Sequence, residues 1–243
     1  MELLVFPLLG IIFVLIFVRE VIAPASRNHC DRRWLILAGS MALITVLATL
    51  AGGYLLADSI RRFALWQAHD YLPVWLVGLL SFLLTSFIFY WWHRATHQFD
   101  WLWRYFHQLH HSARRVEALT AFYAHPHDTL AAVLLSSFSS YLVLGANPLA
   151  AALALFLTGL FDLFLHSDLN TPRWLGYLIQ RPEMHTVHHA YQHHADNYGL
   201  PIWDILFGTW NNPLARSAEL GFAADKSERI TDMLLCQDVH KNP

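Results

Sequence analysis

Long apolar runs divide this chain into segments. Three runs, at residues 3–18, 34–57 and 74–92, each approach the roughly 20 residues that a helix needs to cross the hydrocarbon core of a membrane. No basic segment precedes the first run and no small-residue cleavage site follows it, which favours a retained span over a cleaved signal peptide. The hydrophobic pattern therefore predicts an integral membrane protein that begins with three spans.

Two further apolar stretches lie at residues 129–144 and 149–165. The turn signal Gly145-Ala146-Asn147-Pro148 joins them, and the pair predicts a helical hairpin that either spans or re-enters the membrane. Residues 99–106 are rich in aromatic side chains and predict a helix at the membrane surface, because Trp and Tyr favour the membrane–water boundary. After Thr209 the chain is polar and aperiodic, which predicts a loose tail with one short helix at 230–237.

The basic residues predict how the chain is oriented. The link 23–33 contains Arg27, Arg32 and Arg33, whereas the charges of the link 58–73 are balanced. Because basic loops stay in the cytoplasm, the N-terminus is predicted on the opposite side, and the third span delivers His93 to the cytoplasmic face. The predicted fold is an all-α membrane bundle of about four spans, or three plus a hairpin, with a cytoplasmic helical cap.

Composition narrows the class of protein further. Charged residues make up 14% of the chain, against about 25% in an average globular protein, and the net charge of −2 gives no reason to expect a nucleic-acid partner. The two cysteines lie far apart, so neither a disulfide framework nor a cysteine metal site is predicted. The outlying number is 16 histidines.

Most of these histidines follow helical spacings. His93 and His97 are four residues apart, and the pattern H-x-x-H-H occurs at 107–111 and again at 185–189. On a helix, residues three or four apart share a face, and imidazole is a ligand for zinc, copper, iron and nickel. With the isolated His166, nine histidines are predicted to supply four or five ligands to each of two metal ions: His93, His97, His107, His110, His111, His166, His185, His188 and His189.

Four other residues are candidates for supporting this site or for adding a ligand. Asp162 lies four residues before His166, so a helix places both on one face. His193 lies four residues after His189, His125 precedes Pro126, and Asn197 follows the last histidine cluster. We expect Asp162 to ligate a metal or to orient an imidazole, and Asn197 to reach a ligand histidine.

The spaced motifs resemble the fatty acid hydroxylase / sterol desaturase superfamily of integral-membrane, histidine-box di-iron oxygenases. The resemblance covers about residues 74–209 and rests on YWWHRATH at 90–97, LWRYFHQLHHS at 102–112, TAFYAHP at 120–126, PEMHTVHH at 182–189, DNYG at 196–199 and WDILFGT at 203–209. Ser86 stands where the family usually has an acidic residue, and Tyr123 stands where it usually has Arg.

The resemblance implies a chemistry and a division of the chain. Two iron ions, which zinc can replace in preparations, would activate O₂ to hydroxylate or desaturate a C–H bond of a lipid drawn from the bilayer. A sterol, a fatty acyl chain or a related lipid fits equally. Electrons would come from an external donor, such as a ferredoxin-like or cytochrome b5-like protein, because no flavin or haem-attachment motif is present. The expected parts are N-terminal spans at 1–73, a di-metal catalytic domain at 74–209 and a polar tail at 210–243.

Other classes of protein compete with this interpretation. A membrane metal- or haem-binding protein for electron transfer or transport would also place histidines on spans. A haem protein would place single histidines at facing mid-membrane positions, whereas these cluster at span ends, and a transporter would need polar residues along its spans, which here are nearly bare of them. A zinc hydrolase is a third hypothesis, and Glu183 is its nearby candidate base.

Overall fold

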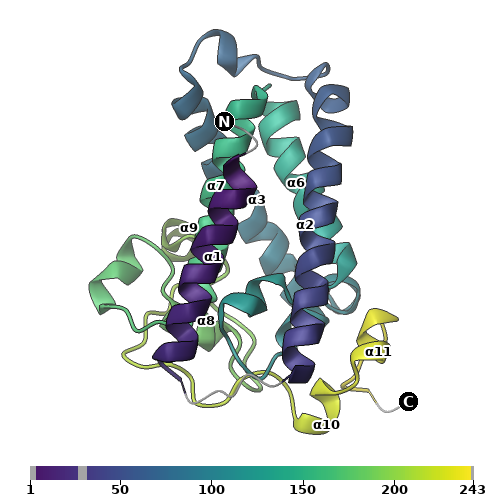
Figure 1. Ribbon diagram of the computed structural model, residues 1–243, viewed down its shortest axis with the longest axis vertical. Coiled ribbons are helices and arrows are strands. Elements are labelled where there is room, and N and C mark those ends of the chain that lie inside the picture. Colours follow the sequence, from purple (N-terminus) through teal and green to yellow (C-terminus); the bar gives the residue numbers. More distant parts are fainter. Residues whose placement is uncertain (1–3, 27–31, 242–243) are drawn as a thin grey trace.

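The computed structural model describes residues 4–26 and 32–241, and within these ranges the regular elements are helices. Four helices are long and apolar enough to cross a membrane: α1 (Val5–Ile22), α2 (Arg32–Arg61), α3 (Val74–Gln98) and α7 (Pro148–Leu165). In Figure 1, α7 lies against α1 and α3, and α2 stands on the other side against α6 (Pro126–Ser137). The expected all-α bundle of about four spans is confirmed, while residue 3 of the first predicted span and Arg27 of the basic link lie outside the described residues.

The predicted hairpin forms from unequal arms. Its first arm is α6 (Pro126–Ser137) followed by the π-helical segment η5 (Phe138–Val143), and its second arm is α7. At the turn, Gly145 has a φ of 57°, a conformation that suits glycine, and Asn147 caps α7 by accepting a hydrogen bond from the Ala150 N–H at 2.9 Å. Pro148 occupies the first helical position, so the turn and the start of α7 are set by local sequence.

Small residues let α3 and α7 approach closely. A Cβ atom on Gly78 would lie 2.8 Å from the Leu153 side chain and 3.0 Å from the Ala150 carbonyl oxygen. Ala150, Ala151 and Val77 are buried in the same hydrophobic cluster. In a membrane such small-residue contacts, rather than hydrophobic burial, hold helices together. The contact fixes α3 against α7, and the far ends of both helices carry predicted ligands.

The remaining segments gather at one end of the bundle and form what we call the cap (residues 99–125 and 166–241; Figure 1). Its elements are α4 (Asp100–Leu102), the π-helical η3 (Trp103–His107), α5 (Gln108–His111), η4 (Ala118–Phe122), η6 (Arg173–Tyr177), α8 (Pro182–His188), α9 (Pro201–Phe207), α10 (Ala224–Ser227) and α11 (Ile230–Leu234). A short 3₁₀ turn, η2 (Ala68–Asp70), lies outside the cap between α2 and α3. Over 99–106 the chain is thus a short α-turn leading into a π-turn rather than one regular helix.

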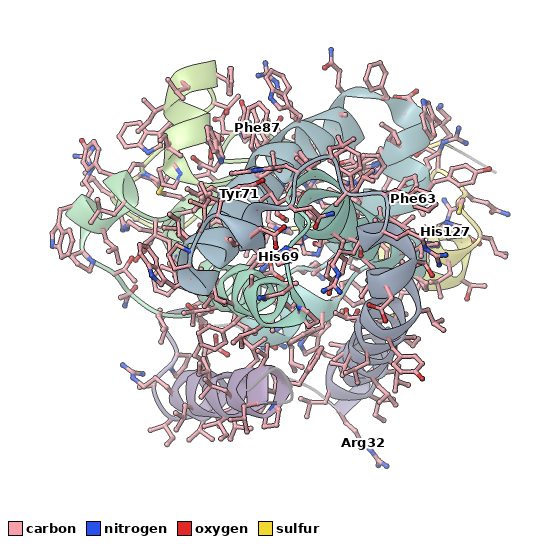
Figure 2. The ribbon with its side chains drawn as sticks, turned by 90° about the horizontal axis from the view of Figure 1, so that it is seen from above. Arg32, Phe63, His69, Tyr71, Phe87 and His127 are labelled. Carbon is pink, nitrogen blue, oxygen red and sulfur yellow. The ribbon has the colours of Figure 1, made fainter. Side chains whose placement is uncertain are left out.

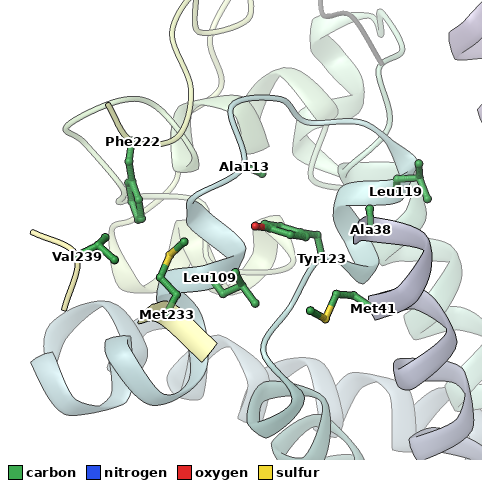
Figure 3. Packing of buried hydrophobic residues seen from close by; sticks show 9 residues of the cluster. All are labelled: Ala38, Met41, Leu109, Ala113, Leu119, Tyr123, Phe222, Met233 and Val239. Atoms are coloured by element: carbon green, nitrogen blue, oxygen red, sulfur yellow. The ribbon is translucent and has the colours of Figure 1, made fainter. Parts of the chain in front are cut away.

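The C-terminal segment is packed and not loose, which corrects the expectation from its polar composition. Phe222, Met233 and Val239 are buried against Leu109 and Tyr123 (Figure 3). Gln108 adds two hydrogen bonds, because its side chain contacts the backbone at residues 237 and 239. A few well-spaced apolar residues were enough to fold this segment over α5, the helix that carries His110 and His111.

Buried polar contacts fasten the outer spans to the cap. The Glu20 carboxylate, at the end of α1, accepts hydrogen bonds from the backbone N–H groups of Ala118 and Asp168. The Trp34 indole, at the start of α2, donates to the Glu117 carboxylate. A buried carboxylate needs such donors to offset its desolvation. The ends of α1 and α2 are therefore held against the cap by specific bonds.

Candidate metal centre

The fold brings all nine predicted histidines together in two neighbouring sets. The five-histidine set contains His93, His97, His107, His111 and His188, and the four-histidine set contains His110, His166, His185 and His189. Within each set the candidate ligand nitrogens lie within 4.8 Å of one another. The sets touch, because the His111 and His189 rings stack with centroids 4.2 Å apart. Helices α3, α5, α7 and α8 all contribute.

Helix geometry decides which histidine joins which set. Each pair at spacing four stays together: His93 with His97, His107 with His111, and His185 with His189. The remaining member of each H-x-x-H-H unit, His110 or His188, joins the opposite set. Successive residues of an α-helix point about 100° apart, so one unit can serve two neighbouring sites.

Backbone carbonyls fix the tautomers of several rings. Nδ1 of His93 lies 2.8 Å from the Tyr198 carbonyl oxygen, that of His110 lies 3.1 Å from the Tyr123 oxygen, and that of His188 lies 2.7 Å from the Asp196 oxygen. A carbonyl oxygen can only accept a hydrogen bond, so each Nδ1 carries the proton. The Nε2 atom of each neutral ring is then a free lone pair, the form in which imidazole binds a metal.

Side chains hold the Nδ1 atoms of three other rings. His107 faces the Asp128 carboxylate at 3.1 Å, and His111 faces Nδ1 of His194 at 3.0 Å. His166 lies 3.0 Å from the backbone oxygen of Asp162 and 3.2 Å from its carboxylate. Such partners set ring orientation and increase ligand basicity.

The Nε2 atoms of the fixed rings point at one another, which tests whether a metal fits. Those of His93 and His107 are 2.9 Å apart, and those of His110 and His166 are 3.2 Å apart. In each pair, the hydrogen-bond partner of Nδ1 keeps the ring proton on that atom. Both Nε2 atoms therefore carry a lone pair, and no proton lies between them. Metal–nitrogen bonds of 2.0–2.1 Å would separate two ligand nitrogens by roughly 3.0–3.4 Å. A cation between the rings satisfies both lone pairs, so the residues fit a metal centre.

Burial favours the neutral, metal-binding form of these rings. Desolvation by burial lowers the pKa of His110, His111, His185, His188 and His189 well below the ordinary value of 6.5, and neighbouring histidines add to the effect. His97 Nε2 and His189 Nδ1 are buried atoms without a hydrogen-bond partner among the described residues. Neither set contains a carboxylate. All the donors that the two sets offer are thus imidazole nitrogens.

A braced loop after α8 positions two of the accepting carbonyls. The Asp204 carboxylate accepts hydrogen bonds from the N–H groups of Tyr198 and Gly199 and from the Thr209 hydroxyl. Burial raises the pKa of Asp204 to about 7, against the effect of these donors. Asp196 has a φ of 67°, a left-handed conformation that this bracing maintains. Substitution at Asp204 would therefore act on His93 through the Tyr198 carbonyl.

The four additional candidates occupy different places. Asp162 contacts His166, as expected of a residue that orients a ligand. Asn197 is buried but bonds the backbone at Met184 and Asn211 and makes no hydrogen bond to a histidine. His193 is exposed beside Asp196, and neither it nor His125 belongs to the two sets. Of the four candidates, Asp162 is therefore the one that contacts a predicted ligand, His166.

Sequence reasoning missed three residues at the centre: Asp128, His194 and Gln180, whose amide nitrogen lies 3.3 Å from Nδ1 of His185. Asp128 lies two positions after Pro126 in the first turn of α6, and its acidic side chain beside His125-Pro126 was the available signal. His194 was visible as a histidine, but its contact with His111 depends on a left-handed backbone, with a φ of 42°. Burial lowers the pKa of His194 to about 4.

Ser86 and Tyr123 are the two positions that differ from the pattern of the family that the sequence resembles. Ser86 accepts a hydrogen bond from the Trp203 indole, and the Tyr123 carbonyl contacts His110.

These features describe a helical protein with four helices long and apolar enough to cross a membrane and two histidine sets that could each hold a metal ion, and comparison with known proteins places it in a family. The model of the fatty acid hydroxylase family matches residues 78–209, more than half of the chain and a segment that contains all nine histidines. The chain therefore belongs to the fatty acid hydroxylase family. No solved structure gives a significant match.

Characterised relatives are lipid enzymes by name. The chain is 32% identical over 154 residues to an ornithine lipid hydroxylase of Rhizobium tropici, which covers 59% of this chain and 44% of the relative. It is 31% identical over 135 residues to the human alkylglycerol monooxygenase, covering 54% and 29%. It is 30% identical over 168 residues to a very-long-chain aldehyde decarbonylase of Oryza sativa subsp. indica, covering 63% of each. The chain spans less than two thirds of each of these proteins.

Proposed function

We propose that this chain is a membrane-bound, O₂-dependent oxidoreductase that hydroxylates or desaturates a C–H bond of a lipid at a histidine-ligated di-iron centre. The observation that carries the proposal is the convergence of nine histidines in sets of five and four, with opposed Nε2 lone pairs. Each set would hold one iron ion. Iron bound there would supply the activation of O₂ and the removal of hydrogen from an unactivated C–H bond.

The protein's own residues would bind, orient and exclude water. The three carbonyls at Tyr123, Asp196 and Tyr198 keep protons on Nδ1 and lone pairs on Nε2. Asp128 gives the five-histidine set a nearby negative charge without occupying a ligand position. The four-histidine set is fully buried, so bulk water is kept from its ligands.

A lipid would reach the centre from the bilayer, because spans α3 and α7 end at the histidines. We propose that this end faces the cytoplasm and that the start of α1 lies on the other side, as the arginine distribution indicates. An external electron donor would then dock on the cap. The relatives' names mention ornithine lipid, alkylglycerol and very-long-chain aldehyde. We infer that a lipid with a long linear chain is the first substrate class to test, ahead of sterols.

The decisive experiment compares metal content and activity in three proteins purified in mild detergent. They are the wild type, the double variant His110→Ala with His188→Ala, and the control His193→Ala. The double variant removes one ligand from each set, whereas His193 is an exposed histidine outside both. We expect about two irons per chain in the wild type and the control, loss of both in the double variant, and O₂-dependent lipid products only where iron is retained.

Other outcomes discriminate among the competing functions. A haem Soret band, or metal retained in the double variant, would contradict the proposal and favour an electron-transfer or transport protein. Turnover of an ester or amide without O₂ would favour a hydrolase. Two zinc ions in place of iron would preserve the site, and expression in iron-rich medium would then be required to recover O₂-dependent activity.

A further inference from the structure

A third group of metal-ligating side chains lies outside the two histidine sets. His125, His127 and Cys236 each offer one ligand atom, and these atoms lie within 4.8 Å of one another. The first two belong to the start of α6, and Cys236 follows α11, more than 100 residues later. Figure 2 shows His127 at the periphery of the molecule, beside the C-terminal segment. We propose that these three residues form a separate site for one Zn²⁺ ion.

The distances suit a tetrahedral zinc ion. Cys236 Sγ lies 3.9 Å from Nε2 of His125 and 4.0 Å from Nδ1 of His127. Zinc bonds of about 2.3 Å to sulfur and 2.0–2.1 Å to nitrogen place tetrahedral sulfur and nitrogen ligands roughly 3.5 Å apart. The two sulfur–nitrogen distances therefore need to close by only about half an ångström. One sulfur and two imidazole nitrogens leave a fourth position for water.

Local structure partly organises the three ligands. His125 is buried at the N-cap of α6, and its ring lies 4.5 Å from that of His127 between centroids. His127 also stacks on Tyr105, with the rings 13° from parallel. Cys236 is half-buried and has a φ of 58°, a strained conformation for a residue other than glycine. Strain of this kind is concentrated at functional positions.

Binding would rearrange three hydrogen atoms. At present the His127 N–H donates to Nδ1 of His125, and Nε2 of His125 and Nδ1 of His127 face the carbonyls of Leu234 and Tyr105. Zinc would take the two ring nitrogens that face Cys236, move each ring proton to the opposite nitrogen, and release the thiol proton to solvent. Three hydrogen bonds would be lost: the capping bond to His125 and the bonds from the two coordinating ring nitrogens to the Leu234 and Tyr105 carbonyls. Structural zinc binding is strong enough to outweigh the loss of three such bonds.

The site would tie the C-terminal segment to the main centre. Asp128 follows His127 directly, and its carboxylate holds Nδ1 of His107 in the five-histidine set. Zinc at the third site would therefore fix the turn that carries Asp128. Burial raises the pKa of the Cys236 thiol and the charge of nearby Arg104 acts in the opposite direction, so zinc would have to displace the thiol proton. The proposal does not depend on the metal or the reaction at the histidine centre.

Cobalt(II) distinguishes this site from the histidine centre. Cobalt bound to thiolate gives an intense near-ultraviolet charge-transfer band, and neither histidine set contains a cysteine. Purified full-length chain, kept reduced with a phosphine, is titrated with Co²⁺ alone. We expect the band to rise to a plateau, to be absent in Cys236→Ser, and to persist in Cys30→Ser, which removes the chain's other cysteine.

The exposed His127 provides the second test. His127→Ala is expected to weaken the cobalt binding reported by this band at least tenfold, and Zn²⁺ should displace the cobalt and abolish the band in the wild type. Absence of the band in the wild type, or an undiminished band in Cys236→Ser, would overturn the proposal. If Cys236→Ser fails to fold, unchanged cobalt affinity in His127→Ala overturns it instead. Failure of the di-iron proposal would leave the charge-transfer band unaffected.

Discussion

The two histidine sets differ in what supports their rings. In the five-histidine set, side chains hold two of the rings: the Asp128 carboxylate faces His107, and the His194 imidazole faces His111. In the four-histidine set, the Asp162 carboxylate lies 3.2 Å from His166 and the Gln180 amide lies 3.3 Å from His185, while backbone carbonyls contact rings in both sets. All members of the second set are buried, whereas His93 and His97 in the first are partly exposed. Substitutions outside the ligands can therefore tune both sets, and the difference lies in the supporting carboxylate: Asp128 beside His107 is mostly buried, whereas Asp162 beside His166 is half-exposed.

The largest expected effect comes from removing one ligand from each set in turn. His166→Ala is expected to lose one of the two metal ions, from the four-histidine set, and His107→Ala to lose the other. Both should abolish activity, because the proposed reaction uses both ions. Elemental analysis of the purified variants measures the metal content. Equal loss of both ions in His166→Ala would show that the sets do not bind independently.

Acid should destabilise the metal-free protein by several kcal/mol. The pKa values lowered by burial belong to His110, His185 and His189 in one set and to His111 and His188 in the other. Below pH 6.5 the unfolded chain binds these protons and the folded chain does not, so stability falls as pH falls. Each group contributes up to about 1.4 kcal/mol per pH unit.

Unfolding of the metal-free chain by denaturant, at pH values from 7.5 to 5, measures this slope. The double variant His110→Ala with His188→Ala serves as the matched comparison, since it lacks one such group from each set. Its slope should be shallower than that of the wild type. Stability independent of pH over this range would contradict the burial of neutral imidazoles.

Asp128→Asn tests the side-chain support of the five-histidine set. Loss of the carboxylate charge beside His107 should weaken metal binding at that set by about 10–100-fold and leave the four-histidine set unchanged. Competition with a chelator, followed per bound ion, separates the two affinities. A uniform loss at both sets would indicate a general disturbance of the fold instead. The control is Asp162→Asn. This variant loses a half-exposed carboxylate beside His166 but keeps the contact between His166 and the backbone oxygen of residue 162.

The smallest effect is expected on stability, from a change at the contact between α3 and α7 that fixes the two histidine sets relative to each other. Gly78→Ala would force a Cβ atom against Leu153 and the Ala150 carbonyl, where α3 meets α7. Overpacking of this kind costs about 1–3 kcal/mol. Gly53→Ala is the matched control, because open space surrounds that position, and its stability should change by less than about 0.5 kcal/mol. Thermal unfolding in detergent compares the two.

The membrane-spanning helices and the spaced histidines could be predicted from the sequence. Spans at 34–57 and 74–92 correspond to α2 and α3, because runs of apolar residues near 20 are specific to membranes. Eight histidines could be proposed as ligands from their spacing and His166 from its place at the end of an apolar stretch, and the structure brings all nine together. Helical spacing explains why His110 and His188 separate from the pairs four residues apart, but it does not decide which pairs share a set or where His166 belongs.

Features that depend on irregular backbone could not be predicted. The π-turn at 103–107 and the left-handed residues His194 and Asp196 have no signature in hydropathy or spacing. The packed C-terminal segment was missed because Phe222, Met233 and Val239 are isolated apolar residues in a polar context. Their burial depends on a surface made by distant residues such as Leu109 and Tyr123. Long-range packing of this type is not encoded in a local pattern.

The π-turn at Trp103–His107 makes the chain sensitive to its length at this point. The Gln108 N–H bonds the Trp103 carbonyl five residues back, and the Trp103 ring lies 5.1 Å from that of His97 and 5.2 Å from that of His111. A π-turn holds one residue more than the α-turn it replaces. Deleting one residue here would restore a regular helix and rotate every preceding side chain by about 100° relative to His107. Single-residue insertions and deletions within 103–106 should therefore be tolerated far less than substitutions.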